Sequence, residues 1–284
     1  MSFLQAAKML SSETKCNLCG QRQFKSVEED QQPFKVLKCL NCSLVFVHPH
    51  PPSVELESHY DDGYYDEWIS KQKARRLKMW QKRLEKITKF KSGGYLLDVG
   101  CGEGAFLGLA QKKEWQVSGT ELSAFAAHYA SKTLNTDIFC GDLLSVHFGE
   151  NFFDVVTMWH VLEHVNDPKK YLSEIHRILK PGGLFVLAVP NVNNLVFQSA
   201  FWIARGRRLK LFTKGEKEIH LYHFSPVTLR RYLEEAGFGS LRLAPDFGII
   251  EPAKKMVNWI SVIPYYLAGI HIFDALEVFA VPAK

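Results

Sequence analysis

The chain has 284 residues, of which 46% are hydrophobic and 23% are charged, as in an ordinary globular protein with one large domain or a domain plus a small module. Its net charge of +5 is unevenly placed, because residues 71–91 carry ten Lys or Arg against one acid and residues 205–217 carry six against one. The remainder is net acidic, which excludes a uniformly basic nucleic-acid binder. No secretory signal opens the sequence, so we expect a cytoplasmic protein.

Two Cys-x-x-Cys pairs lie in residues 1–50, which end at the proline-rich HPHPP. Cys16 and Cys19 form the first pair, and Cys39 and Cys42 form the second after a spacer of 19 residues. Four thiolates at this spacing suit tetrahedral coordination of Zn²⁺. We therefore predict a zinc-ribbon module over residues 1–50 that holds a structural zinc ion.

Residues 51–92 form the second predicted region. They begin with the aromatic and acidic segment HYDDGYYDEW, which we expect to be a loop, and continue as an amphipathic helix over 67–90. The apolar residues of this helix recur at three- and four-residue spacing, with Lys and Arg between them: Leu77, Trp80, Leu84 and Ile87.

From Gly93 onward, strand and helix patterns alternate, which predicts a parallel sheet with helices on both faces. The expected strands are 95–99, 115–120, 136–140, 152–158 and 183–189. The expected helices are 104–113, 123–133, 168–179 and 226–236. Two further strands are expected in the tail, at 239–244 and 276–282.

An uncharged stretch of 18 residues, MVNWISVIPYYLAGIHIF at 256–273, precedes the last strand. Its length would allow a membrane span. It contains Asn258, Pro264 and Gly269, and the next strand is expected in the same sheet, so we favour a buried or membrane-surface helical insertion. The third predicted region is thus a domain over 93–284, with a lid over its substrate cleft at 191–225 and an apolar insertion at 248–275.

The segment GGYLLDVGCGEGAFL raises the question of which nucleotide binds after the first strand of this domain. Gly100, Gly102 and Gly104 form GxGxG, and with Ala105 they also satisfy the dinucleotide pattern. Glu121 ends the next strand, where an acid can accept hydrogen bonds from the ribose hydroxyls of a dinucleotide or of another nucleoside-containing ligand. The glycines alone therefore do not decide between the ligands.

Two carboxylates favour a cationic ligand at this turn. Asp98 precedes the first glycine and Glu103 lies between the second and third, where they would repel a pyrophosphate but attract a sulfonium and an ammonium. S-adenosylmethionine (SAM) carries both cations and no phosphate. Asp142, in GDLL after the third strand, can accept a hydrogen bond from an adenine amino group.

Five segments resemble, in order and spacing, the successive motifs of class I SAM-dependent methyltransferases: LLDVGCGEGAFL, GTELS, CGDLL, FFDVVTMWHVLEHV and ILKPGGLFVLAVPN. The resemblance implies an α/β, Rossmann-like sheet of seven strands with the last strand antiparallel. It also implies that the glycines lie under the methionine part, Glu121 on the ribose and Asp142 at the adenine. The expected cofactor-binding residues are Tyr65, Asp98, Gly100, Cys101, Gly102, Gly104, Glu121, Leu122, Asp142, Leu143 and Trp159.

Other segments resemble particular branches of the family. One segment after the fifth strand, HLYHFSPVTLRRYLEEAGF, resembles part of bacterial methyltransferases that act on sugars, polysaccharides and similar small molecules. The cysteine module, followed by PHPP and YDDGYY, resembles the N-terminal region of some of these enzymes. LEHV is shared with ubiquinone-pathway O-methyltransferases. Glu163 and His164 in this segment could bind a divalent cation as in those relatives, although helix capping is the interpretation that we prefer.

Three histidines are candidates for the general base. Trp159 and His160 follow the fourth strand and should face the cleft, where His160 could take a proton from a hydroxyl acceptor during an in-line displacement at the methyl carbon. His220 and His223 are second candidates. For all three, a packing or capping role is the alternative.

We therefore predict a SAM-dependent methyltransferase whose methyl acceptor is small or carrier-linked, such as a hydroxyl of a sugar or of a glycan precursor. There are two alternatives. One is an RNA methyltransferase that binds RNA with the zinc ribbon and the basic helix, and the other is a non-catalytic SAM-binding protein. If the two basic segments border the cleft, they would attract an anionic acceptor, a phospholipid-linked carrier or a membrane surface. Nucleic acid is not the expected partner. The identity of the acceptor, the methylated atom and the oligomeric state stay open.

Overall fold

The computed structural model describes residues 14–51, 73–215, 219–248 and 252–283. Its main feature is a seven-stranded sheet in the order β10-β11-β8-β7-β4-β5-β6, in which β11 alone runs antiparallel to its neighbours. The predicted class I arrangement is confirmed. The strands are β4 (Tyr95–Val99), β5 (Gln116–Glu121), β6 (Ile138–Cys140), β7 (Phe153–Trp159), β8 (Leu179–Pro190), β10 (Phe238–Pro245) and β11 (Ala275–Pro282).

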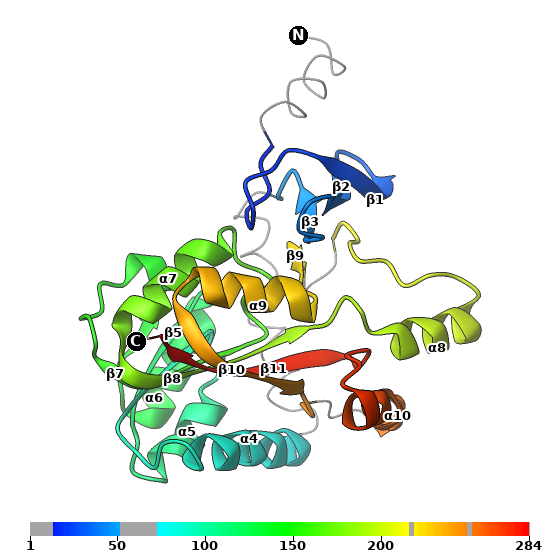
Figure 1. Cartoon of the computed structure of the whole chain (residues 1–284). Helices are drawn as coiled ribbons and strands as arrows, with labels where there is room; N and C mark the ends of the chain where they lie inside the picture. The colour runs from blue at the N-terminus through cyan, green and yellow to red at the C-terminus, as the bar shows by residue number, and fades with distance from the viewer. Residues whose placement is uncertain (1–13, 52–72, 216–218, 249–251, 284) are drawn as a thin grey trace.

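Helices cover both faces of the sheet, because successive strand residues point alternately to either side (Figure 1). Leu96 and Val155 enter one apolar core, whereas Leu97 and Val156 enter the other. The first core is formed with α4 (Lys73–Thr88) and α5 (Ala105–Gln111), beside α6 (Ala124–Leu134). The second is formed with α7 (Pro168–Ile178) and α9 (Pro226–Glu235).

Helix α4 differs from its predicted amphipathic pattern. Leu84 and Ile87 are buried as expected, but Leu77 is exposed, and two arginines of the helix, Arg76 and Arg83, are buried instead. Carboxylates on neighbouring elements explain this difference, since each arginine reaches one of them within 4 Å. The helix therefore carries part of its positive charge into the protein.

The cysteine module forms a second, antiparallel sheet of β1 (Phe24–Gln31), β2 (Phe34–Cys39), β3 (Val45–His48) and β9 (Tyr222–His223). Strand β9 comes from far along the chain and was not predicted. It pairs Tyr222 with Phe46, so that a segment next to the methyltransferase core completes the sheet of the module. Asn17 extends this junction by donating to Asp167 and accepting from Tyr232.

Two further helices lie at the carboxyl edge of the parallel strands, α8 (Leu195–Arg205) and α10 (Pro252–Ala268) (Figure 1). Helix α8 was not predicted, and α10 lies within the predicted apolar insertion. Among the described residues, no helix is both long enough and apolar enough to cross a membrane.

Candidate active site

The glycine turn after β4 adopts a backbone conformation in which a side chain at the glycines would be strained or would clash with its neighbours. Gly100, Gly102 and Gly104 all have positive φ, at 72°, 54° and 78°. A Cβ on Gly100 would lie 2.5 Å from the side chain of Val161, and one on Gly104 would lie 2.9 Å from that of Leu134. The turn is therefore specified both by conformation and by close approach.

Glu121, at the end of β5, holds this turn in place. One carboxylate oxygen accepts from the backbone N–H of Gly102 and the other from that of Ser123, each at 2.9 Å. Leu122 beside it is 48% exposed, whereas Cys101 is buried. The predicted contact of Glu121 with the ribose stays a prediction.

Asp98, the last residue but one of β4, is 2% exposed and accepts a hydrogen bond of 2.6 Å from Thr157. Burial raises the pKa of this carboxyl to about 8, although Thr157 and Arg83 act in the opposite direction. A cation bound at the turn would favour the ionised carboxylate. Thr157, on β7, was missed by the sequence reasoning.

Asp142 begins a 3₁₀ helix over Leu143–Ser145 and is already engaged within the protein. One of its oxygens accepts from the N–H of Leu144 at 2.7 Å, and the other accepts from the hydroxyl of Tyr171 on α7. Leu143 is 1% exposed, so its side chain belongs to the core. The hydrogen bond from Tyr171 was not foreseen, and the predicted contact of Asp142 with adenine stays a prediction.

An aromatic cluster lies behind the cleft edge of β7. The rings of Trp159, Trp80 and Phe106 meet pairwise with centroids 5.6–5.9 Å apart. The guanidinium of Arg83 lies over Trp159, 4.2 Å from the ring centroid. Trp159 is 6% exposed, so its side chain lies mainly within this cluster, and its predicted contact with the cofactor stays a prediction. Tyr65, the remaining predicted cofactor residue, lies outside the described residues.

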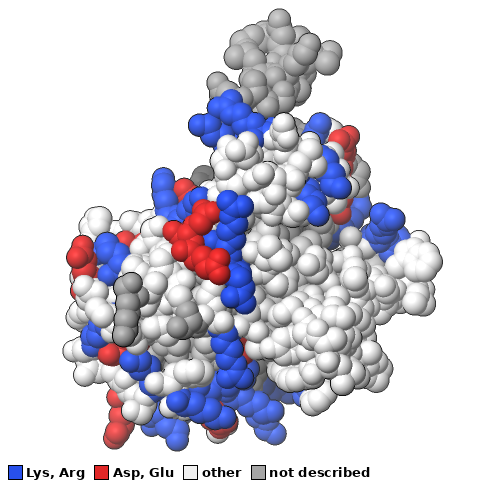
Figure 2. Space-filling view, viewed as in Figure 1, with Lys and Arg blue, Asp and Glu red and all other residues white. Residues whose placement is uncertain are grey.

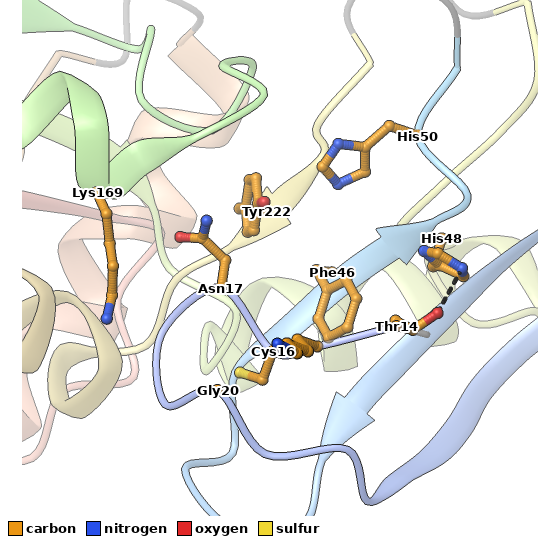
Figure 3. Close-up of a pocket in the computed structure, with 10 residues that line it drawn as sticks. Thr14, Cys16, Asn17, Gly20, Phe46, His48, His50, Lys169 and Tyr222 are labelled. Atoms are coloured by element: carbon orange, nitrogen blue, oxygen red, sulfur yellow. Dashed lines mark hydrogen bonds between the residues drawn. The ribbon is translucent and has the colours of Figure 1, made fainter. Parts of the chain in front are cut away.

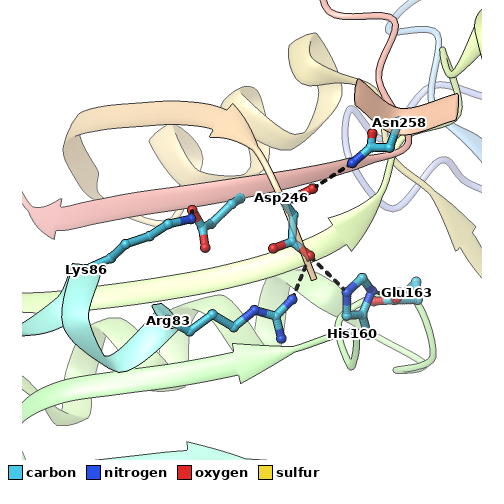
Figure 4. A network of polar contacts seen from close by, with 7 residues as sticks. Arg83, Lys86, His160, Glu163, Asp246 and Asn258 are labelled. Carbon is cyan, nitrogen blue, oxygen red and sulfur yellow. Dashed lines mark hydrogen bonds and ion pairs between the residues drawn. The ribbon is translucent and has the colours of Figure 1, made fainter. Parts of the chain in front are cut away.

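His160 lies between two buried carboxylates (Figure 4). Its Nε2 is 3.5 Å from Asp246, which follows β10, and its Nδ1 is 3.5 Å from Glu163. Burial opposes protonation of the imidazole, but the two carboxylates outweigh it and raise its pKa to about 9. The ring keeps 40% of its side-chain surface exposed, so it remains accessible to solvent at the carboxyl edge of the sheet.

Asp246 is the centre of the network in Figure 4. It is 3% exposed and accepts a hydrogen bond of 2.6 Å from Arg83, which is 4% exposed. Lys86 and Glu277 form a second ion pair one helical turn away, at 2.5 Å. Asp246 was missed by the sequence reasoning; the available signal was an acid placed directly after a strand that ends at the carboxyl edge.

Glu163 does not cap a helix, contrary to our preferred interpretation, because α7 begins with Asp167 as its N-cap. Glu163 is 1% exposed, and its two carboxylate oxygens have no hydrogen-bond partner among the described residues. Its ligand atom and those of His164 and His220 lie within 4.8 Å of one another, a geometry that could hold a divalent cation. The structure thus adds His220 to the pair found in the sequence.

His223, on β9, is less suited to the role of base that we considered. Its side chain is 7% exposed, and burial lowers its pKa to about 3, so it is neutral at pH 7. Its ring lies 6.2 Å from that of His220, whose ring meets that of His164 at 4.9 Å. His164, His220 and His223 therefore form one group of rings, apart from the more exposed His160.

The four paired cysteines come together as predicted. Sγ of Cys16 is 3.5 Å from that of Cys42, Sγ of Cys19 is 3.6 Å from that of Cys39, and all four sulfurs lie within 4.8 Å of one another. Tetrahedral zinc with Zn–S bonds of about 2.3 Å requires sulfurs about 3.8 Å apart. The donor set and its spacing therefore fit a structural zinc ion.

Purified protein is expected to contain about one zinc ion per chain, because the four thiolates neutralise and enclose the ion together. The Cys39→Ser variant should lose this zinc, whereas Cys140→Ser, which changes an exposed cysteine outside the cluster, should keep it. Elemental analysis of the three proteins measures the content. A metal-free wild-type protein whose ribbon remains folded would contradict the zinc site.

A cavity of about 540 Å³ lies between the cysteine module and α7 (Figure 3). His48, His50 and Tyr222 line one part of it, and Asn17 and Lys169 line another. Burial lowers the pKa of both histidines, to about 4 in His50, so both are neutral at pH 7. The cavity belongs to the junction between the module and the main domain.

Comparison with known proteins agrees with this geometry. Residues 70–242 match the family model described as "Methyltransferase domain". The chain is 30% identical over 184 residues to demethylmenaquinone methyltransferase of Staphylococcus aureus, a match that covers 58% of this chain and 76% of the relative. It is also 30% identical over 148 residues to an S-adenosylmethionine-dependent methyltransferase of Mycolicibacterium smegmatis, and here it spans about half (52%) of the relative.

Solved structures show the same fold. A SAM-dependent methyltransferase from Thermotoga maritima superposes with a TM-score of 0.56 at 17% identity, over 81% of this chain and 100% of that one. One from Archaeoglobus fulgidus gives a TM-score of 0.51 at 18% identity, over 77% and 99%. With a family model that spans more than half of its length and the matching sheet order and glycine turn, this chain belongs to the methyltransferase-domain family.

Proposed function

We propose that the protein transfers the methyl group of SAM to a hydroxyl oxygen of a small or carrier-linked acceptor, with His160 as the group that receives the hydroxyl proton. The observation that carries this proposal is the position of His160, which is exposed to the cleft between Asp246 and Glu163 and directly follows Trp159 on β7. When bound at the glycine turn, SAM supplies an electrophilic methyl carbon on its sulfonium.

Different residues of this chain would orient the cofactor, stabilise its charge and accept the proton. Glu121 and the glycine turn would orient the cofactor, and Asp98 would favour its positive charge. As the acceptor oxygen bonds to the methyl carbon and the carbon–sulfur bond breaks, the hydroxyl proton passes to the imidazole of His160. Asp246 and Glu163 then stabilise the resulting imidazolium, and Arg83 keeps Asp246 ionised and in place.

The alternatives have less support. Two cations of the basic helix, Arg76 and Arg83, are buried against carboxylates, so α4 presents fewer cations to RNA than its sequence suggests. The Staphylococcus relative, named for demethylmenaquinone, also supports a small-molecule acceptor. In a non-catalytic SAM-binding protein, the two buried carboxylates on either side of His160, those of Asp246 and Glu163, would have no role.

The proposed function is tested in two steps with purified protein. Calorimetry should show binding of SAM and none of NAD, and Glu121→Ala should weaken SAM binding by about 1.5–3 kcal/mol, the loss of hydrogen bonds to a charged group. The exposed Glu150→Ala is the matched control and should bind normally. Labelled SAM and fractionated extract should then place label in a small-molecule or lipid fraction. Label in RNA, or binding of SAM with no S-adenosylhomocysteine formed, would overturn the proposal.

A further inference from the structure

Helix α10 buries two polar side chains beside the apolar Val262 and leaves most of its apolar residues exposed. Its side chains Asn258 and Ser261 are buried, at 4% and 2% exposure, and Asn258 donates to the backbone oxygen of Asp246. Tyr265 on the same face donates its hydroxyl to the oxygen of Leu243. A surface helix of a globular protein normally buries its apolar face, so these inward polar contacts leave the apolar face of α10 directed away from the protein.

That outward face is a continuous apolar stripe. Its residues recur at three- and four-residue spacing and are 50–82% exposed: Met256, Trp259, Ile260, Ile263, Tyr266, Leu267 and Ile270. Helix α8, packed beside α10, has no buried residue and adds Leu195, Trp202 and Ile203, at 56–76% exposure. These ten side chains, which we call the α8/α10 face, include two Trp and one Tyr, the residues that favour a membrane–water interface.

Positive charge borders this face. Arg205 ends α8, Arg207 and Arg208 follow it, and the guanidinium of Arg207 lies 5.7 Å from the ring centroid of Phe201. Lys210 comes next, and no acid occurs from 195 to 215. Figure 2 shows the surface over α8 and α10 as a broad area without Lys, Arg, Asp or Glu, with Lys and Arg at its margin.

We propose that the α8/α10 face docks the protein on an anionic lipid bilayer, with the apolar side chains in the interfacial layer and Arg205, Arg207, Arg208 and Lys210 at the phosphate level. Scattered exposed apolar residues are ordinary, but a contiguous apolar face with basic residues around it marks an interaction surface. Glu28 is an acid beside this border, where it accepts from the backbone N–H of Leu211, and the four cations outnumber it. These cations match lipid phosphates better than they match a second copy of this chain, which would present the same cations.

Docking here would also place the active site at the bilayer. Both helices start from the carboxyl edge of the sheet, where β8 and β10 end, and Asn258 connects α10 to the residue that faces His160. The inference stands on the surface alone, however, and does not depend on which molecule accepts the methyl group.

The test is co-sedimentation of the full chain with vesicles of phosphatidylcholine alone or mixed with phosphatidylglycerol. Wild-type protein should sediment with the mixed vesicles and far less with phosphatidylcholine. Arg207→Gln with Lys210→Gln should lower partitioning to the mixed vesicles about 25-fold, at about fivefold for each basic residue. Lys113→Gln with Lys132→Gln is the charge-matched control and should sediment like wild type. These two exposed lysines lie just after α5 and in the last turn of α6, outside the α8/α10 face.

The apolar part is tested with Ile203→Ser and Leu267→Ser together, which should lower partitioning about 100-fold, since each side chain loses burial in the interface. Val227→Ser, which changes a side chain 72% exposed on α9, is the matched control. Unchanged SAM binding confirms that each variant is folded. Wild-type protein that stays in solution, or a double variant that sediments normally, would overturn the proposal. So would a wild-type dimer by light scattering that the Ile203/Leu267 variant converts to a monomer without any vesicle binding.

Discussion

The His160→Ala variant is expected to lower kcat by about 10²–10⁴-fold, the usual contribution of a positioned acid–base group. The imidazole is the titratable side chain that lies between Asp246 and Glu163 and stays 40% exposed toward the cleft. SAM affinity should change little, because the glycine turn and Glu121 do not contact this ring in the described structure. Single-turnover measurements with labelled SAM give the rate of transfer directly.

The pH profile distinguishes a base from a residue that only packs. Because the carboxylates raise the pKa of His160 to about 9, only roughly one molecule in a hundred carries the neutral imidazole at pH 7. If the neutral ring takes the proton, kcat should rise about tenfold per pH unit from pH 7 and level off near pH 9. The profile of His160→Gln should lack this rise.

His128→Ala is the matched control, because it removes an exposed histidine from α6, remote from the cleft edge of β7. It should retain wild-type kcat and the same pH profile. Full activity in His160→Ala would contradict its role as base. The candidate would then be His220, since burial already keeps His223 from contact with solvent.

The Arg83→Met variant is expected to lower the free energy of unfolding by about 3–5 kcal/mol. It leaves the carboxylate of Asp246, which is 3% exposed, without the guanidinium that donates to it at 2.6 Å. Urea unfolding measures the loss. Lys180→Met is the matched control: its pair with Asp154 has a similar length of 2.8 Å but is partly exposed, so its loss should cost about 0–1 kcal/mol.

A second substitution separates a buried charge from lost packing. In Arg83→Met combined with Asp246→Leu the carboxylate that Arg83→Met alone would leave unpaired is absent, so most of the stability should return. A free energy of unfolding for Arg83→Met within about 1 kcal/mol of the wild-type value would equal the effect of losing a surface ion pair. The buried pair would then not stabilise the fold as its geometry implies.

The same network sets a pH dependence of stability. Burial opposes ionisation of Asp246, but Arg83 and His160 outweigh it and hold its pKa well below the usual value of 3.8. Its contribution is thus complete above that value and is lost as the pH falls toward the lowered pKa. His160, whose pKa is raised from 6.5, contributes fully below pH 6.5 and loses its contribution as the pH rises through about 9. In Arg83→Met the loss of stability at acid pH should therefore begin at a higher pH than in the wild type.

Local patterns in the sequence determined a large part of this protein. The seven strands and the helices α5, α6, α7 and α9 were predicted within a few residues, because burial against a sheet imposes periods of 2 and 3.6 on the apolar residues. The glycine turn and each Cys-x-x-Cys pair were predicted from close spacing along the chain. The two pairs lie 20 or more positions apart and meet only through the fold of the module.

Only the tertiary structure decided which distant residues meet. Arg83 and Asp246 are separated by 163 positions, and they touch because α4 packs beside the sheet edge at which β10 ends. The same holds for Tyr222, which pairs with Phe46 to complete the sheet of the cysteine module. Strand order and helix packing fix such contacts, and no local period encodes them. For α10 the sequence showed an apolar helix, but the direction of its apolar face depended on where Asn258 and Ser261 found polar partners, which is a property of the folded neighbourhood.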